Sequence, residues 1–324
     1  MSRLCLVLSG LIALALPLSL LAGRVWIAPW AEPVPHAATI LAELRLPRGT
    51  LALVIGAGLG GAGAAMQGYL RNPLADPGLF GIAPSAAFGA VMALFLGIAG
   101  IPLVLPAFAL IGAGGAMAML AVIAGRGGIG MGGGIALFTL AGLMIASLAG
   151  TLTSLAISLS PNPFATSEIV TWLMGALTDR SWADVWIAGP LTLAGLVVLW
   201  STGRSLDALT LGEQAALSLG VQAKRLQWCI VLGIGLVVGA GVAVAGIIGF
   251  VGLMVPHIVR PFTDRRPSSL ILPSALAGAL LVLVADTFCR VLPMATELRL
   301  GIALSVLGAP FFLALLLRLR RTLA

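Results

Sequence analysis

The stretch RLPRGTLALVIGAGLGGAGAAMQGYLRNPLADPG, residues 45–78, decides the fold class of this chain. Its central part, residues 49–69, carries no charge and consists mostly of apolar and small residues. An α-helix needs about 20 such residues to cross a bilayer. Pro73 and Pro77 forbid a continuous helix through the segment that follows. The stretch therefore predicts one membrane-spanning helix followed by a turn-rich loop.

The composition of the whole chain extends this prediction. Of its 324 residues, 60% are hydrophobic and 9% are charged, whereas soluble domains carry about 25% charged residues. Further apolar runs of spanning character lie at residues 4–22, 79–100, 103–124, 134–159, 183–202, 226–246, 247–262, 270–288 and 300–317. We therefore predict an all-α membrane protein of about ten transmembrane helices, with residues 1–324 in a single domain. The run at 247–262 is short and begins in a glycine-rich stretch, which predicts a broken or re-entrant helix.

The basic residues orient the predicted helices. Cytoplasmic loops of membrane proteins carry an excess of Lys and Arg. With both termini inside, twelve of the 18 basic residues face the cytoplasm and six face outside. The outside set is Arg24, Arg45, Arg48, Arg180, Arg290 and Arg299. The first run is then an uncleaved helix, residues 23–48 form an external loop, and the net charge of +7 reflects topology rather than a nucleic-acid partner.

The spacing of the glycine residues indicates how the predicted helices pack. Three G-x-x-x-G pairs occur, at Gly56/Gly60, Gly128/Gly132 and Gly235/Gly239, and the first and third lie inside predicted spans. Small residues at this spacing let membrane helices approach closely. The first pair overlaps a G-x-G-x-x-G pattern, but that pattern binds dinucleotides only after a strand in a soluble βαβ unit. A phosphate-binding G-x-x-x-x-G-K-[ST] motif is also missing from the sequence, so we expect any ATP use to belong to another chain.

Few residues suggest chemistry. Asp286 precedes Arg290 by four residues, which predicts a local ion pair on one helix face or, alternatively, a functional charge in the membrane. His257 is expected to pack near a helix end, with proton transfer as the alternative. Cys5, Cys229 and Cys289 lie far apart and form no metal or disulfide pattern. We therefore predict no enzymatic activity, no metal site and no cofactor.

Two predicted cytoplasmic segments stand out from the apolar background. One is the loop NPLADPG at residues 72–78. The other, residues 203–225, is the longest polar internal segment, and within it Gly212 and Gly220 bracket EQAALSL, a short amphipathic helix. A separate protein that supplies energy for transport would dock on this helix. The alternative is that the segment is a plain connecting loop.

Four blocks of the chain carry a resemblance to a known family. They are residues 45–90, LGEQAALSLGV at 211–221, VAVAGIIGFVGLMVPHIVR at 242–260 and ELRLGIALSVLGAPFFLALLL at 297–317. Together they resemble FecCD-type permeases of bacterial ABC importers for iron-siderophores, haem and cobalamin. The resemblance implies a type II importer bundle in the inner membrane that forms a homodimer. It also implies two cytoplasmic ATPase subunits and a periplasmic binding protein as partners.

The resemblance also assigns residues. Those that match a docking pocket for carboxylates of the binding protein are Arg45, Arg48 and Arg290. Those that match the ATPase coupling helices are Leu211, Gly212, Glu213, Ala216, Leu219 and Gly220. Asn72 and Leu74 match a cytoplasmic gate. The chain departs from the family at Arg299, where relatives often have proline, so an extra positive charge is expected beside the docking pocket.

A secondary transporter driven by an ion gradient is the alternative to an ABC permease. That class predicts inverted repeats and polar sites at the membrane midplane, and the sequence shows no convincing repeat and few charges in its predicted spans. The sequence does not choose among the metal chelates that the family carries.

Overall fold

The computed structural model describes residues 3–27, 35–124 and 134–323. These residues form helices, turns and loops without any strand. The long helices are α1 (Arg3–Leu21), α3 (Leu46–Tyr69), α5 (Val104–Ala124), α6 (Gly134–Ser158), α8 (Trp182–Ser201), α11 (Ala223–Ala245), α13 (Pro267–Val291) and α14 (Leu300–Leu323). The short ones are α2 (Ala37–Thr39), α4 (Ile82–Phe95), α7 (Pro163–Leu173), α9 (Gly203–Leu209), α10 (Glu213–Ser218) and α12 (Val251–Val259). A π-helical turn spans Ile40–Arg45, and 3-10 turns span Pro77–Phe80 and Arg260–Phe262.

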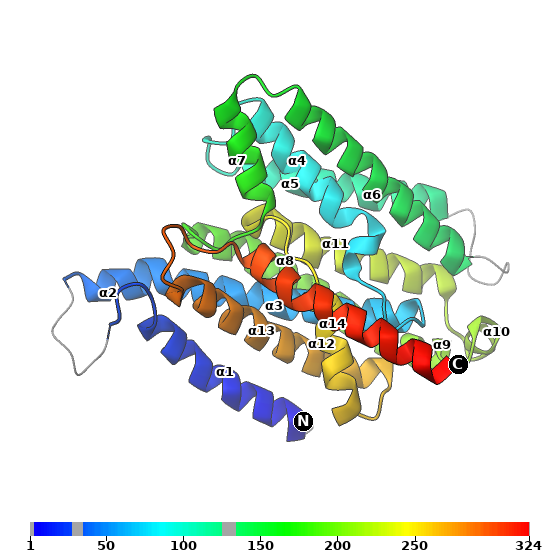
Figure 1. Ribbon diagram of the computed structural model, residues 1–324. Coiled ribbons are helices and arrows are strands. Elements are labelled where there is room, and N and C mark those ends of the chain that lie inside the picture. The colour runs from blue at the N-terminus through cyan, green and yellow to red at the C-terminus, as the bar shows by residue number, and fades with distance from the viewer. Residues whose placement is uncertain (1–2, 28–34, 125–133, 324) are drawn as a thin grey trace.

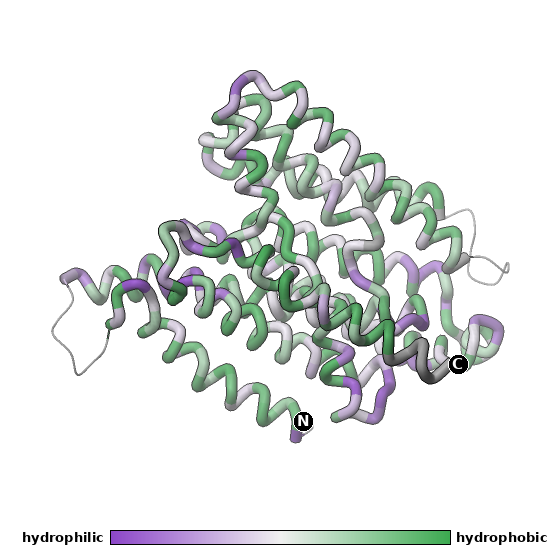
Figure 2. Tube along the Cα trace, viewed as in Figure 1, coloured by the Kyte–Doolittle hydropathy of each residue, from purple (hydrophilic) through white to green (hydrophobic). Residues whose placement is uncertain are grey.

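Eight helical stretches of the described residues are long and apolar enough to cross a membrane. The helices α4 and α12 are shorter, at 14 and 9 residues, whereas a crossing takes about 20. Figure 2 shows hydrophilic residues mainly at helix ends and in loops, with hydrophobic stretches between them. The all-α membrane fold is therefore confirmed, while a count of ten full crossings is not.

The helices form two groups joined by one central helix. In Figure 1, α4, α5, α6 and α7 lie together in the upper part, and α1, α3, α12 and α13 in the lower part. The pairs α3–α13 and α4–α5 are packed along their lengths. Helix α11 contacts α3, α4, α5 and α8, so it belongs to both groups. It is accordingly buried along most of its length.

Glycine explains the close approach of α3 and α13. A methyl group on Gly56 would clash with the carbonyl oxygen of Gly278, and one on Gly60 would clash with that of Ser274. The pair Gly235/Gly239 of α11 faces side chains of α5 in the same way. These two G-x-x-x-G pairs therefore act as predicted, in helix packing, and the nucleotide pattern lies within α3. The pair Gly128/Gly132 lies outside the described residues.

The predicted external loop at 23–48 is shorter in the structure because helix begins at Ala37. The segment 37–45 is apolar enough to continue the helix, and only Pro47 opposes this. Proline lacks the N–H that an α-helix needs. A π-helical turn immediately before Pro47 changes the backbone hydrogen bonds from the i→i−4 to the i→i−5 pattern, so the Leu46 N–H donates to the Leu41 carbonyl oxygen. The helical stretch Ala37–Tyr69 then reaches 33 residues.

The predicted break near residue 247 is present. Helix α11 ends at Ala245, and residues 246–250 connect it to α12 without helical structure. Gly246 and Phe250 both have positive φ, at 70° and 66°. A side chain larger than hydrogen is strained in this region of backbone space, and a methyl group on Gly246 would also clash with the Trp172 carbonyl. The predicted span 247–262 is thus a linker followed by a short helix.

Candidate functional sites at the two ends of the bundle

Arg48 is the centre of an ion cluster at one end of the bundle, which we call the ion-pair end. Its Nε lies 3.0 Å from both carboxylate oxygens of Asp286 on α13. Its Nη2 lies 2.9 Å from Oε2 of Glu297, in the loop between α13 and α14. Asp286 is only 1% exposed and Glu297 is 22% exposed. One guanidinium therefore joins two helices and a loop.

The other two predicted docking arginines hold the C-terminal end of α1. Arg45 donates from Nη1 to the carbonyl oxygens of Leu20 and Leu21, at 2.7 and 2.9 Å. Arg290 donates from Nη2 to Oγ and the carbonyl oxygen of Ser19, both at 2.9 Å. Both arginines are buried. They satisfy carbonyl groups that a helix end leaves without intrahelical partners.

Two further arginines fasten the loop of residues 292–299. Arg24 is exposed and donates to the carbonyl oxygens of Met294 and Ala295, at 3.1 and 3.3 Å. Arg299 donates to Oγ1 of Thr178 at 3.2 Å. Arg24 and Arg48 thus contact this loop from outside, and its own Arg299 fastens it to Thr178.

The structure therefore places Arg45, Arg48 and Arg290 at one end, as the sequence predicts, but engages each of them inside the chain. The expected local pair of Asp286 with Arg290 is replaced by contacts to other helices, because Asp286 pairs with Arg48 and Arg290 with Ser19. The extra charge of Arg299 contacts the hydroxyl of Thr178. Docking of a binding protein on these arginines stays a prediction.

The opposite end carries the predicted coupling segment, and we call it the coupling end. Gly212 and Gly220 have φ of 104° and 85°, which favour glycine, and they flank α10 as predicted. Ala216 is buried, while Leu211 and Leu219 are 68% and 64% exposed. The predicted short helix at 213–219 is therefore present, with an apolar face turned outward beside it. Helix α9, which precedes it, was not predicted.

The predicted gate residues lie next to this helix. Arg71 reaches Glu213 of α10, with 3.6 Å between Nη2 and Oε1. Asn72 is exposed, and its Oδ1 accepts a hydrogen bond from the Leu74 N–H at 2.9 Å. The loop at 70–76 and the coupling segment therefore form one continuous surface. Whether Asn72 and Leu74 act as a gate stays a prediction.

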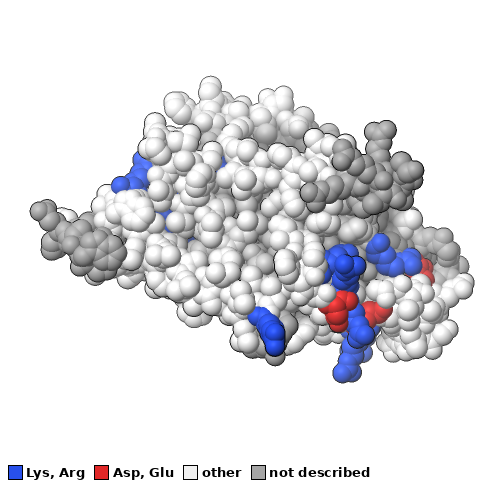
Figure 3. Space-filling model, turned by 60° about the horizontal axis from the view of Figure 1, so that its bottom comes forward, with Lys and Arg blue, Asp and Glu red and all other residues white. Residues whose placement is uncertain are grey.

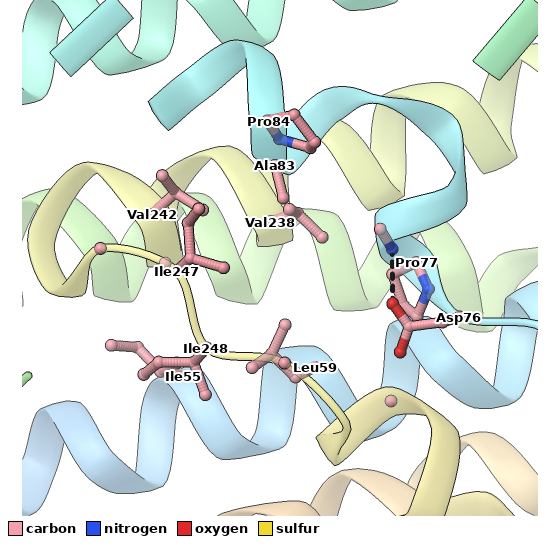
Figure 4. Close-up of a pocket in the computed structure, with 15 residues that line it drawn as sticks. Ile55, Leu59, Asp76, Pro77, Ala83, Pro84, Val238, Val242, Ile247 and Ile248 are labelled. Carbon is pink, nitrogen blue, oxygen red and sulfur yellow. Dashed lines mark hydrogen bonds between the residues drawn. The ribbon is translucent and has the colours of Figure 1, made fainter. Parts of the chain in front are cut away.

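An apolar cavity of about 170 Å³ lies between α3, α4, α11 and the linker 246–250 (Figure 4). Figure 4 shows Ile55, Leu59, Val238 and Val242 pointing into it, with Asp76 at one edge. Asp76 accepts a hydrogen bond from the Gly78 N–H at 2.8 Å. Burial raises the pKa of Asp76, and that hydrogen bond opposes the rise. Pockets for drug-sized ligands measure about 300–1,000 Å³, so this cavity is too small for such a ligand.

A larger open groove follows the side of α14. It measures about 750 Å³, and its walls come from the end of α7, the linker 246–250 and α14. Its apolar residues include Met174, Phe250, Ile302 and Val306. Apolar surface of this kind on a membrane protein faces lipid or a second helical surface.

Sequence reasoning missed one helix beside this groove, α7. Its signal was present, because Asn162 precedes Pro163, and these are favoured residues at the N-cap and first position of a helix. Oδ1 of Asn162 accepts a hydrogen bond from the Ala165 N–H at 2.9 Å.

Among the described residues, no group of three or more His, Cys, Asp or Glu is placed to hold a metal ion.

Comparison with known proteins agrees with this architecture. The sequence profile of the FecCD transport family matches residues 5–318. The vitamin B12 import system permease protein BtuC of Vibrio cholerae is 37% identical, with 96% of this chain and 92% of that protein covered. The hemin transport system permease protein HmuU of Yersinia pestis is 36% identical, with 86% and 83% covered.

A solved structure supports the same assignment. It is described as an inward-facing conformation of a metal-chelate type ABC transporter, and its chain superposes with a TM-score of 0.89 and 29% identity. The match covers 98% of this chain and all of that one. The chain therefore belongs to the FecCD transport family and is a membrane permease of the ABC importer type, a transport component rather than a catalytic enzyme.

Proposed function

We propose that this permease carries a metal chelate across the bacterial inner membrane, driven by a separate ATPase. The observation that carries the proposal is the full-length likeness to permeases named for vitamin B12 and hemin import. Both cargoes are large metal chelates, and the two relatives are almost equally similar to this chain. We therefore propose the class of cargo, metal chelates, and not one particular chelate.

A homodimer would supply the pathway. The central cavity of one copy is small, whereas the groove beside α14 is open, apolar and more than four times larger. Two copies facing each other across this groove would enclose a channel with few polar groups. Such a channel exerts little selectivity, so the binding protein would select the cargo.

The coupling end would receive two ATPase subunits. The exposed leucines Leu211 and Leu219 flank α10 and offer apolar contact, and Glu213 links the helix to the loop of Asn72 and Leu74. Movement of α10 would thus reach the predicted gate through one contact. With the coupling end inside, both chain termini lie in the cytoplasm, in accord with the distribution of basic residues.

Substitution of both leucines tests the coupling assignment. We expect L211D/L219D to fold normally and to lose at least tenfold in the amount of ATPase subunit that co-purifies, because charge would replace the apolar contact. Leu96→Asp is the matched control, since Leu96 is 54% exposed at the end of α4 away from the coupling segment. Normal ATPase binding by the double variant would contradict the assignment.

Docking on the ion-pair end requires a test that keeps the fold intact. The variant R48Q/D286N removes both charges of the buried pair together, so neither charge is left buried without its partner. If Arg48 receives a carboxylate of the binding protein, affinity should fall about tenfold, as for loss of a charge-assisted hydrogen bond. Unchanged affinity in a folded double variant would overturn the docking role of Arg48.

ATP dependence distinguishes this proposal from the ion-gradient alternative. Asp286, the candidate charge for such a mechanism, is held by Arg48 and only 1% exposed. Uptake by the reconstituted permease with its ATPase and binding protein should require ATP and persist without an ion gradient. The absorption spectrum of the ligand that co-purifies with the binding protein would identify the chelate.

A further inference from the structure

A second set of arginines, at the coupling end, lines a pocket between α3, α9, the turn Arg260–Phe262 and the start of α13. The pocket holds about 200 Å³. Its polar lining comes from Gln67, Arg71, Asn72, Thr210, Arg260 and Arg265. Figure 3 shows charged side chains gathered in one area of this face, while most of the rest of the face carries no charge.

Arg260 is fixed in position at the wall of this pocket. Its Nη2 donates to Oε1 of Gln67 at 2.7 Å. Nε2 of Gln67 in turn lies 3.4 and 3.3 Å from the carbonyl oxygens of Gly252 and Leu253 on α12. The Nε of Arg260 is buried and has no hydrogen-bond partner among the described residues. The buried Nε is out of reach of a ligand, so an acceptor from outside the chain would bind the terminal N–H groups of this guanidinium at the pocket wall.

The nearby carboxylates do not neutralise this pocket. Asp207 accepts hydrogen bonds from the N–H and the hydroxyl of Ser268. Asp264 binds the Ser269 hydroxyl and pairs with Arg266. Glu213 approaches Arg71 alone.

Arg260 and Arg265 are thus left without an acidic partner in the described part of the chain. Arg265 is exposed and repels the charge of Arg260. An anion between the two would relieve this repulsion, and the pocket lining contains no carboxylate that already does so.

We propose that this pocket binds the phosphate group of an anionic phospholipid. The volume suits a phosphate and part of a headgroup, and arginine donors match phosphate oxygens. Ile258 and Phe262, on either side of Arg260 in the sequence, are 47% and 70% exposed. Neither residue lines the pocket, but both supply exposed apolar surface close to Arg260 in the chain, which suits acyl chains. Basic pockets between membrane helices on the cytoplasmic side bind headgroups in this way.

A bound phosphate would tie three elements together. Gln67 belongs to α3, its carbonyl partners belong to α12, and Arg260 begins the turn that leads to α13. A lipid at Arg260 and Arg265 would therefore stiffen the junction between these helices, next to the predicted gate at Asn72. The composition of the inner leaflet would then influence the stability of this end of the permease.

Lipid titration of the full-length protein in a neutral detergent tests the proposal. We expect phosphatidylglycerol to bind, measured by native mass spectrometry, and to raise the unfolding temperature. Phosphatidylcholine with the same acyl chains should do less, because its choline cation already neutralises the phosphate. Inorganic phosphate forms the third arm. If inorganic phosphate raises the unfolding temperature as much as phosphatidylglycerol does, the pocket is a site for free phosphate and not for a lipid.

Matched variants show where the lipid binds. R260Q/R265Q should weaken phosphatidylglycerol binding at least tenfold. K224Q/R266Q, which removes the same net charge from exposed residues outside the pocket lining, should bind normally. R265Q alone, at an exposed side chain, should weaken binding severalfold and covers the case in which the double variant fails to fold. Full binding by R265Q and R260Q/R265Q, or an equal loss in the control, would overturn the proposal.

Discussion

The two ends of the bundle use arginine differently. At the ion-pair end, each of Arg45, Arg48 and Arg290 contacts a carboxylate, hydroxyl or carbonyl group of the same chain. At the coupling end, Arg260 and Arg265 line a pocket that contains no carboxylate. The two ends carry the same residue type in different electrostatic settings. A buried charge is tolerated only when it is paired and hydrogen-bonded. Arginines at the first end are therefore needed for the fold itself, and those at the second remain available to ligands.

The largest effect should follow from breaking the pair at the ion-pair end. Asp286→Asn leaves Arg48 without its buried counter-charge, and such losses cost about 3–5 kcal/mol. Unfolding in detergent, followed by temperature or denaturant, measures the change. Asp264→Asn is the control, because Asp264 is 54% exposed at the other end and should lose far less. The apolar pair R48M/D286L should recover much of the stability, and a failure of D286N to destabilise would contradict the structural role of the pair.

A smaller effect should follow from freeing Arg48 only on its outer side. Glu297 is partly exposed and occupies Nη2 of Arg48. If the binding protein docks there, Glu297 competes with its carboxylates, and Glu297→Gln should raise the affinity about two- to fivefold. Glu43→Gln removes an exposed acid close in sequence to Arg45 and controls for net charge. Reduced affinity in the Glu297 variant would mean that this residue supports docking.

Asp76 is expected to impose a pH dependence. Burial raises its pKa in the folded chain above the ordinary 3.8. As pH rises above about 4, Asp76 loses its proton in the unfolded chain but keeps it in the folded chain. The free energy of unfolding therefore falls with pH until the pH passes the raised pKa of Asp76 in the folded chain. Asp76→Asn should remove that loss and gain stability relative to the parent over this range.

Asp264 supplies a control of opposite sign. The Ser269 hydroxyl, foremost, lowers the pKa of this exposed acid. Asp264→Asn should therefore lose stability relative to the parent as pH rises toward about 3.8, below the range of Asp76, and the difference should stay constant at higher pH. Unfolding curves of parent and both variants at several pH values measure the differences, and equal pH dependence in all three would contradict both assignments.

The smallest effect is expected at the ion pair of the coupling end. Arg71 and Glu213 are 3.6 Å apart, and the Arg71 side chain is 42% exposed. Exposed pairs contribute about 0–1 kcal/mol, so Glu213→Gln should change unfolding stability by about 0.5 kcal/mol or less. A loss as large as that of Asp286→Asn would show that the two ends do not differ as described.

The helices were predictable because their signal is local. Apolar runs bounded by charges or prolines gave α3, α5, α8, α11 and α13 to within a few residues, and two glycines gave α10. The partners of the arginines were not predictable in this way. Arg48 and Asp286 are 238 residues apart in the sequence, and only the packing of α3 on α13 brings them together. A pair four residues apart contributes about 0.2–0.5 kcal/mol, so Asp286 and Arg290 take partners on other helices.

The contact of Gly56 with Gly278 has a consequence for movement. Each backbone lies where a methyl group on the other would clash, so these helices cannot slide past one another without breaking the fit. We therefore expect α3 and α13 to move together in a transport cycle. We expect relative movement at the borders of this pair, and the non-helical linker 246–250 between α11 and α12, with positive φ at Gly246 and Phe250, is one connection where it can occur.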